Sequence, residues 1–211
     1  ETAFMLNAYN VAGLKALAVL LVAVDDPEAT RYAADAEAYE DCLRRALKDS
    51  FQKGPIVPVS ALRWVPTCSF RAEGRGPKVM GLDGETSFSH RTYFAFDSLI
   101  GPQYATYLGI LSPQDRMTDW MLEVAHRHYH RGLVAESQPF YSRHPELHLL
   151  RGERDLFLNA FYSGLAATSD HETFSFWEHI HKVSLHKTHE EAWSLMQLRR
   201  MLWLEDGDQL R

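Results

Sequence analysis

The sequence predicts an all-α fold, organised as an array of helical hairpins. Apolar residues recur at helical spacing in successive segments, and several of these segments begin at typical helix-start signals. The segments follow one another as three pairs along the chain. Consecutive helix pairs are typical of helical arrays and toroids, whereas an α/β sheet requires strands that alternate with helices. We therefore expect one all-α domain across residues 1–211.

The first pair begins with an apolar helix, predicted from Ala3 to Val24, whose only charge is Lys15. This helix is nearly long enough to cross a bilayer, but polar residues and Gly13 interrupt it, so we expect a helix buried on most sides. Asp26 and Pro27 predict the N-cap and first position of the second helix. Its inward face is predicted from residues at helical spacing: Tyr32, Ala36, Tyr39, Leu43 and Leu47.

Two further pairs are predicted. The second comprises residues 91–111 and a helix after Ser112 and Pro113, on which one face carries Met117, Trp120, Met121, Val124 and Ala125. The third comprises residues 153–167 and 188–204, where Thr188 and Glu191 form a capping box. Residues 54–88 hold five of the 12 glycines and four of the nine prolines, which predicts an irregular or short β insertion. Residues 135–152 and 169–187 are expected to be non-helical and to form a rim.

Composition excludes several function classes. The 22 basic and 28 acidic residues give a net charge of -6 without long runs of one sign. We therefore expect no nucleic-acid partner and no membrane partner. Cys42 and Cys68 allow at most one disulfide and do not distinguish the cytoplasm from the periplasm. Both ends resemble cuts in a longer chain, so the remaining domains of the same polypeptide, or a second copy in a homodimer, are the expected protein partners.

Histidine is unusually concentrated in the second part of the chain. Ten of the 11 histidines lie between residues 126 and 211. A metal-dependent enzyme is one hypothesis that this count raises, and His126 and His130 have helical i,i+4 spacing. However, the zinc-protease pattern H-E-x-x-H is absent from the sequence, as is the serine-hydrolase pattern G-x-S-x-G. We therefore expect no metal and no other cofactor.

Two clusters of residues are suited to carbohydrate chemistry. Around Glu178, the first cluster combines a carboxylate with aromatic rings and imidazoles: Trp177, His179, His181, His189 and Trp193. Aromatic faces stack on the C–H faces of sugars, imidazoles bind hydroxyl groups, and a carboxylate can move protons. The second cluster extends from Glu136 to His148 and includes Tyr141, Arg143 and His144. The alternatives are that Glu178 is a surface residue and Trp177 a core residue, and that residues 136–148 are only a rigid connection.

The chain resembles the six-hairpin glycosidase superfamily, whose members are (α/α)6 toroids and include trehalases and rhamnosidases. The resemblance rests first on the tandem helix pairs. Residues 138–145 (QPFYSRHP) and 159–166 (NAFYSGLA) are also similar to segments of large bacterial members. The third ground is residues 173–179 (TFSFWEH). It implies that this chain is the second half of a toroid and that Glu178 is the base that activates water.

This resemblance and the clusters together predict a bacterial glycoside hydrolase with a two-carboxylate mechanism and a carbohydrate substrate. We expect Glu178 to be the base and Glu136 the acid available within this chain. The expected substrate contacts are Trp177, Tyr141, Arg143, His144, His179, His181, His189 and Trp193. A non-catalytic helical module that binds sugar or protein is the alternative, because the same fold hosts other functions.

Overall fold

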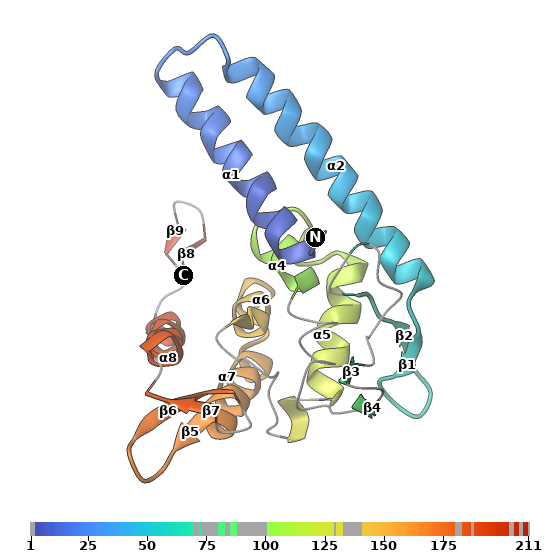
Figure 1. Ribbon diagram of the computed structural model, residues 1–211, viewed down its shortest axis with the longest axis vertical. Helices are drawn as coiled ribbons and strands as arrows, with labels where there is room; N and C mark the ends of the chain where they lie inside the picture. The colour runs from blue at the N-terminus through green and yellow to red at the C-terminus, as the bar shows by residue number, and fades with distance from the viewer. Residues whose placement is uncertain are drawn as a thin grey trace.

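The computed structural model describes residues 3–69, 72, 80–82, 85–87, 101–128, 130–132, 141–179, 183–186, 188–202, 205–206 and 209–210. These residues are mostly helical with a few short strands, which confirms the all-α class. In Figure 1, a long hairpin of two helices projects from the rest of the molecule, with its turn at the far end. The hairpin consists of α1 (Phe4–Ala23) and α2 (Ala29–Lys53).

Short strands follow the hairpin. An antiparallel pair comprises β1 (Ile56–Pro58) and β2 (Trp64–Pro66), and a second pair comprises β3 (Met80–Leu82) and β4 (Glu85–Ser87). These strands confirm the predicted short β insertion. The next elements are α4 (Gly101–Tyr107), α5 (Arg116–His128) and the 3-10 turn η2 (His130–Gly132).

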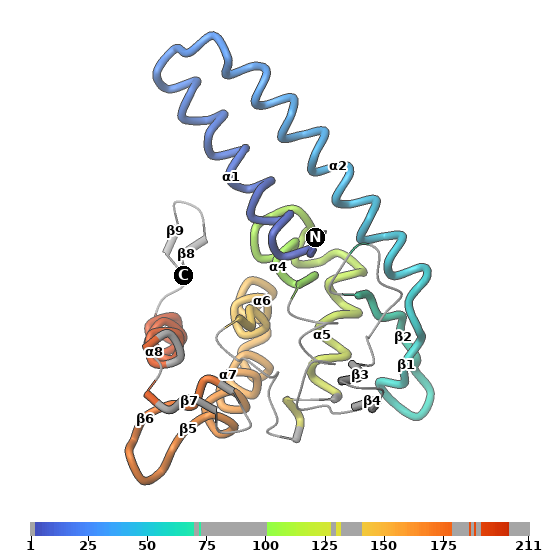
Figure 2. The backbone as a smooth tube through the Cα atoms, in the orientation of Figure 1, coloured from blue at the N-terminus to red at the C-terminus, as the bar shows by residue number. Residues whose placement is uncertain are grey.

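The last part of the chain comprises three helices and a small sheet, and the tube in Figure 2 shows α6 and α7 between α5 and α8. The helices are α6 (His144–Leu150), α7 (Arg154–Thr168) and α8 (Thr188–Leu202). Between α7 and α8 lies an antiparallel sheet of β5 (Ser169–Asp170), β6 (Ser175–His179) and β7 (Val183–Leu185). The pair β8 (Glu205–Asp206) and β9 (Gln209–Leu210) follows α8.

The main apolar core joins the base of the hairpin to α4 and α5. Its buried residues are Phe4, Ala8, Val11, Leu43, Leu47, Phe51, Cys68, Tyr104, Ala105, Ile110, Leu111 and Met121. The face of α2 predicted from helical spacing points into this core, because Ala36, Leu43 and Leu47 are buried. Both cysteines are free thiols, so the single disulfide that the sequence allows is not formed.

The expectation that the first helix is buried on most sides is wrong. Its buried residues are Phe4, Ala8, Val11 and Ala18, whereas Val19 is 71% exposed and Val22 is 65% exposed. The physical reason is that α2 covers one face of α1 and the outer turns project beyond α4 (Figure 1). Among the described helices, α1 is the one that is long and apolar enough to cross a bilayer, judged by length and composition alone.

Two predicted boundaries also change. Helix α2 begins at Ala29, and the Asp26 carboxylate instead accepts a hydrogen bond from the Glu28 backbone in the preceding turn, at 2.8 Å. Residues 135–152 are not wholly non-helical, because α6 occupies His144–Leu150. Pro145 lies at the start of α6, a position where proline favours a helix because its missing N–H has no partner to lose. Residues 91–100 of the second predicted pair lie outside the described residues.

Gly54 ends α2 at a point of close backbone approach. A Cβ atom at this position would lie 1.8 Å from the carbonyl oxygen of Thr67, just after β2. The backbone N–H of Thr67 donates to Pro55, which holds the two segments together at 2.9 Å. A glycine is therefore required where the β1–β2 hairpin folds back on the end of α2.

Gly54→Ala should lower the free energy of unfolding by about 1–3 kcal/mol, because the added methyl group overlaps the Thr67 carbonyl. Gly13→Ala is the matched control, since position 13 is an exposed site in α1 where an added Cβ atom would meet no other atom within 4 Å. It should raise the free energy of unfolding by about 0.5–1 kcal/mol through helix propensity. Urea unfolding of both variants measures the two effects. Effects of the same sign would contradict the role assigned to Gly54.

Candidate functional site

Polar side chains are buried where α8 packs against α6. Trp193, Gln197 and Arg200 lie on one face of α8, because they follow the i, i+4, i+7 spacing of a helix. The indole N–H of Trp193 donates to the carbonyl oxygen of Ser142 at 3.2 Å, and the Arg200 guanidinium lies 3.8 Å from the Glu146 carboxylate. We call this set the α6–α8 polar cluster; it comprises Gln103, Ser142, Arg143, Glu146, Trp193, Gln197 and Arg200.

Arg143 lies at the centre of the α6–α8 polar cluster. Its guanidinium is 3.5 Å from the carboxylate of Glu146, which is fully buried, and 5.1 Å from the ring centroid of Tyr107. Its backbone N–H donates to the side-chain oxygen of Gln103 on α4. Burial alone would lower the pKa of Arg143, but the Glu146 carboxylate and three nearby tyrosines together outweigh burial and raise it. Arg143 is therefore a fixed cation between three helices.

Several buried polar atoms of the α6–α8 polar cluster have no hydrogen-bond partner among the described residues. They are Gln103 Nε2, Arg143 Nε, Glu146 Oε2, and both Nε2 and Oε1 of Gln197. Buried polar atoms in folded proteins almost always bond to protein or water, and leaving one unbonded is costly. This cluster can therefore offer both donors and acceptors to a polar ligand or to water.

Glu178 and Trp177, predicted to act together, are neighbours on strand β6. Glu178 is half-buried. Trp177 pairs with Leu185 of β7, and its indole N–H donates to the Asp170 carboxylate at 3.1 Å. Hydrogen bonds from the backbone and hydroxyl of Thr173 lower the pKa of Asp170, which favours the anionic acceptor. Because successive side chains on a strand point to opposite faces, Trp177 and Glu178 face opposite sides of the sheet.

The sheet is connected to the first turns of α8. The hydroxyl of Ser175 donates to the Glu191 carboxylate at 3.2 Å, and Ser175 also lies 3.0 Å from Nδ1 of His186. Glu191, predicted to form a capping box with Thr188, bonds to β6 through Ser175. Helix α8 therefore links the sheet, which it contacts through Glu191, to the α6–α8 polar cluster, which it contacts through Trp193 in its second turn and Arg200 in its last.

The remaining predicted contacts are placed as follows. The Tyr141 carbonyl accepts a hydrogen bond from the Tyr104 hydroxyl at 2.8 Å. His144, predicted to lie on a loop, is fully buried in α6, where its ring lies 5.5 Å from that of His130. Glu136 and His181 lie outside the described residues. For His179 and His189, the structure describes the backbone in β6 and α8 but not the side chains.

Sequence reasoning missed a buried pair formed by His148 and Glu153. Gly152 follows the C-cap of α6, and its φ of 75° lets the Glu153 backbone N–H reach back to the His148 carbonyl oxygen at 2.9 Å. This turn brings the Glu153 carboxylate within 2.8 Å of His148 Nδ1. Because the carboxylate can only accept, Nδ1 carries the proton. A glycine shortly after an apolar helical segment is the sequence signal that could have predicted this turn.

The environment of this pair is polar and tightly connected. Arg151 donates to Glu153 at 2.8 Å and to Asp119 at 2.7 Å, which ties the end of α6 to α5. His148 and His126 line a cavity of about 190 Å³ with these groups. Burial lowers the pKa of His148 to about 4, although the bond to Glu153 acts in the opposite direction. Within the described ranges, no group of three or more His, Cys, Asp or Glu residues is arranged to hold a metal ion.

Comparison of the chain with protein-family models, with curated proteins and with solved structures gave no match.

The free energy of unfolding should fall as the pH is lowered from 6.5 to 4. Folded His148 has a pKa of about 4, whereas the unfolded imidazole titrates near 6.5. The unfolded state therefore binds more protons in this interval, and stability is lost there, by about 3 kcal/mol. Urea unfolding at several pH values measures the slope. His148→Gln should flatten it, whereas His171→Gln, at an exposed turn, should leave it unchanged. An equal slope in wild type and His148→Gln would contradict this assignment.

Proposed function

We propose that this protein is a glycoside hydrolase of the six-hairpin type that binds its saccharide along α8. The observation that best supports this proposal is the set of buried, unpartnered polar atoms in the α6–α8 polar cluster. Sugar hydroxyl groups both donate and accept, so one saccharide can satisfy amide, guanidinium and carboxylate atoms together. The ring of Tyr107 lies 5.1 Å from the Arg143 guanidinium and suits the C–H face of a sugar.

The spacing along α8 favours an oligosaccharide over a single sugar. Glu191 contacts β6 in the first turns of the helix, and Arg200 contacts Glu146 near its end. At the rise of an α-helix, these positions are separated by roughly 14 Å. A ligand that reaches from the first turns of α8 to Arg200 therefore extends over more than one sugar unit.

Glu178 is the proposed base and Glu136 the proposed acid. In this scheme, a carboxylate at Glu178 accepts a proton from the attacking water, while a carboxylic acid at Glu136 protonates the departing glycosidic oxygen. Arg143 and Gln197 hold the saccharide, and Trp177 supports the strand that carries Glu178. This scheme inverts the anomeric configuration and needs the two carboxyl groups about 6.5–9.5 Å apart, whereas a separation of about 5–5.5 Å would make Glu178 the nucleophile of a retaining mechanism.

Glu178→Gln should lower kcat by roughly 10²-fold or more on the glycoside that the wild type hydrolyses, because the amide cannot accept the proton from water. The measurement is release of nitrophenol from a panel of aryl glycosides and of reducing ends from oligosaccharides. Glu172→Gln is the matched control, since Glu172 is exposed on the turn between β5 and β6 of the same sheet. Its kcat should equal that of the wild type.

Each other outcome of this assay removes part of the proposal. Unchanged activity in Glu178→Gln would remove Glu178 from the role of base. Saccharide binding without hydrolysis of any substrate by the wild type would replace the hydrolase with a non-catalytic sugar-binding module. Absence of both binding and hydrolysis across the panel would overturn the carbohydrate function.

Gln197→Leu should weaken saccharide binding and at the same time stabilise the free protein. The Gln197 amide is fully buried and has no partner among the described residues, so its removal should raise the free energy of unfolding by about 1 kcal/mol. Calorimetric titration and urea unfolding measure the two effects. Gln114→Leu, exposed before α5, is the control and should leave saccharide affinity unchanged. Unchanged affinity in Gln197→Leu would place the saccharide elsewhere.

A further inference from the structure

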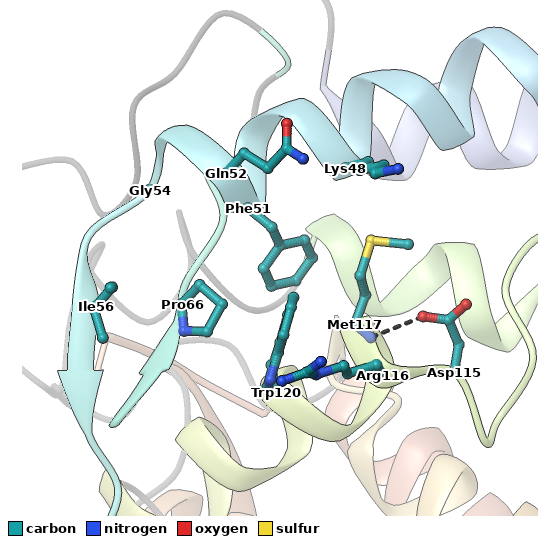
Figure 3. Close-up of a pocket in the computed structure, with 10 residues that line it drawn as sticks. All are labelled: Lys48, Phe51, Gln52, Gly54, Ile56, Pro66, Asp115, Arg116, Met117 and Trp120. Carbon is teal, nitrogen blue, oxygen red and sulfur yellow. Dashed lines mark hydrogen bonds between the residues drawn. The ribbon is translucent and has the colours of Figure 1, made fainter. Parts of the chain in front are cut away.

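A separate pocket lies where the end of α2, the β1–β2 hairpin and the start of α5 meet (Figure 3). Its volume is about 560 Å³, within the range of pockets that bind small organic molecules. None of its lining residues belongs to the α6–α8 polar cluster or to strand β6. The pocket is therefore independent of the proposed hydrolase site.

The walls of this pocket are mainly apolar and aromatic. The rings of Phe51 and Trp120 lie 5.5 Å apart at an angle of 51° and form one wall. Ile56 and Pro66 lie on the opposite side, and Met117 stands beside the rings (Figure 3). Ile56 is 62% exposed in the free protein, so a ligand that covers it gains apolar contact. These walls suit a flat apolar body.

Two cations stand at the edge of the same pocket. Lys48 and Arg116 line it, and neither forms an ion pair within the part of the chain that the structure describes. The Arg116 guanidinium lies 5.1 Å from the centroid of the Trp120 ring, so it remains close to the apolar wall. The Asp115 carboxylate also lines the pocket and accepts a hydrogen bond from the Met117 backbone at 2.7 Å, so the edge holds two cations and one anion. The edge therefore favours an anionic group.

We propose that this pocket binds a small aromatic anion. The aromatic body lies among Phe51, Trp120 and Ile56, and its carboxylate, sulfonate or phosphate group lies between Lys48 and Arg116. Apolar burial supplies most of the affinity, and the two cations select for negative charge.

Calorimetric titration with naphthoate tests the proposal, with naphthylmethanol as the neutral probe of similar shape. Naphthoate should bind with one-to-one stoichiometry and more tightly than naphthylmethanol. Lys48→Gln combined with Arg116→Gln should weaken naphthoate about two- to fivefold for each charge removed, and leave naphthylmethanol unchanged. Lys53→Gln is the matched control, because this exposed lysine of the same helix pairs with Asp49 and does not line the pocket. It should not change either affinity.

A second measurement locates the probe. In an NMR titration of protein with labelled methionine methyl groups, the Met117 signal is identified by its disappearance in Met117→Leu. Naphthoate should shift this signal more than the signals of the other five methionines. Equal affinities for the two probes, or naphthoate affinity unaffected by loss of both cations, would overturn the selection for an anion. No binding at millimolar naphthoate, or shifts confined to other methionines, would overturn the pocket assignment.

Discussion

The Tyr104 side chain joins the apolar core to the polar side of the molecule, and the arrangement of α6 depends on it. Its ring is 1% exposed and lies 5.3 Å from the ring of Tyr9 on α1. Its hydroxyl donates to the Tyr141 carbonyl, and Arg143 lies 5.5 Å from the ring centroid. Burial raises the pKa of Tyr104, so the hydroxyl remains a donor. One side chain thus fixes the segment from which Arg143 and Glu146 extend.

Burying the charges of Arg143, Glu146 and Arg200 is energetically unfavourable. Glu146 is fully buried between the guanidinium groups of Arg143 and Arg200, at 3.5 and 3.8 Å. Removing such ions from water costs several kcal/mol each, and apolar side chains of similar volume are often equally stabilising. Packing alone therefore gives little reason for this arrangement. A binding site that holds hydroxyl groups in fixed positions is one function that would account for it, and this is the physical basis of our proposal that a saccharide binds at the α6–α8 polar cluster.

Helical spacing predicted the elements whose apolar faces meet the main core. Leu43 and Leu47 of α2 are examples, because the same periodicity that identifies the helix also identifies its buried face. Helix α6 escaped prediction because seven residues contain too few turns for a periodic signal, and because Pro145 also favours irregular structure. Residue types predicted a polar site around residues 136–148. The α6–α8 polar cluster also contains Gln103 of α4 and Gln197 of α8, which are distant from that segment in sequence. Tertiary packing, which a local pattern does not contain, brings them together.

The histidines illustrate the same limit. Their number suggests metal chemistry or a solvent-facing rim, yet His130, His144 and His148 are each at most 2% exposed. Burial disfavours the charged imidazolium, and for His148 the Schellman turn at Gly152 supplies a carboxylate that selects the Nδ1–H tautomer. A buried neutral imidazole of this kind orients hydrogen bonds between helices. For His148, the structure therefore supplies an explanation in packing: a hydrogen bond to the Glu153 carboxylate at the end of α6.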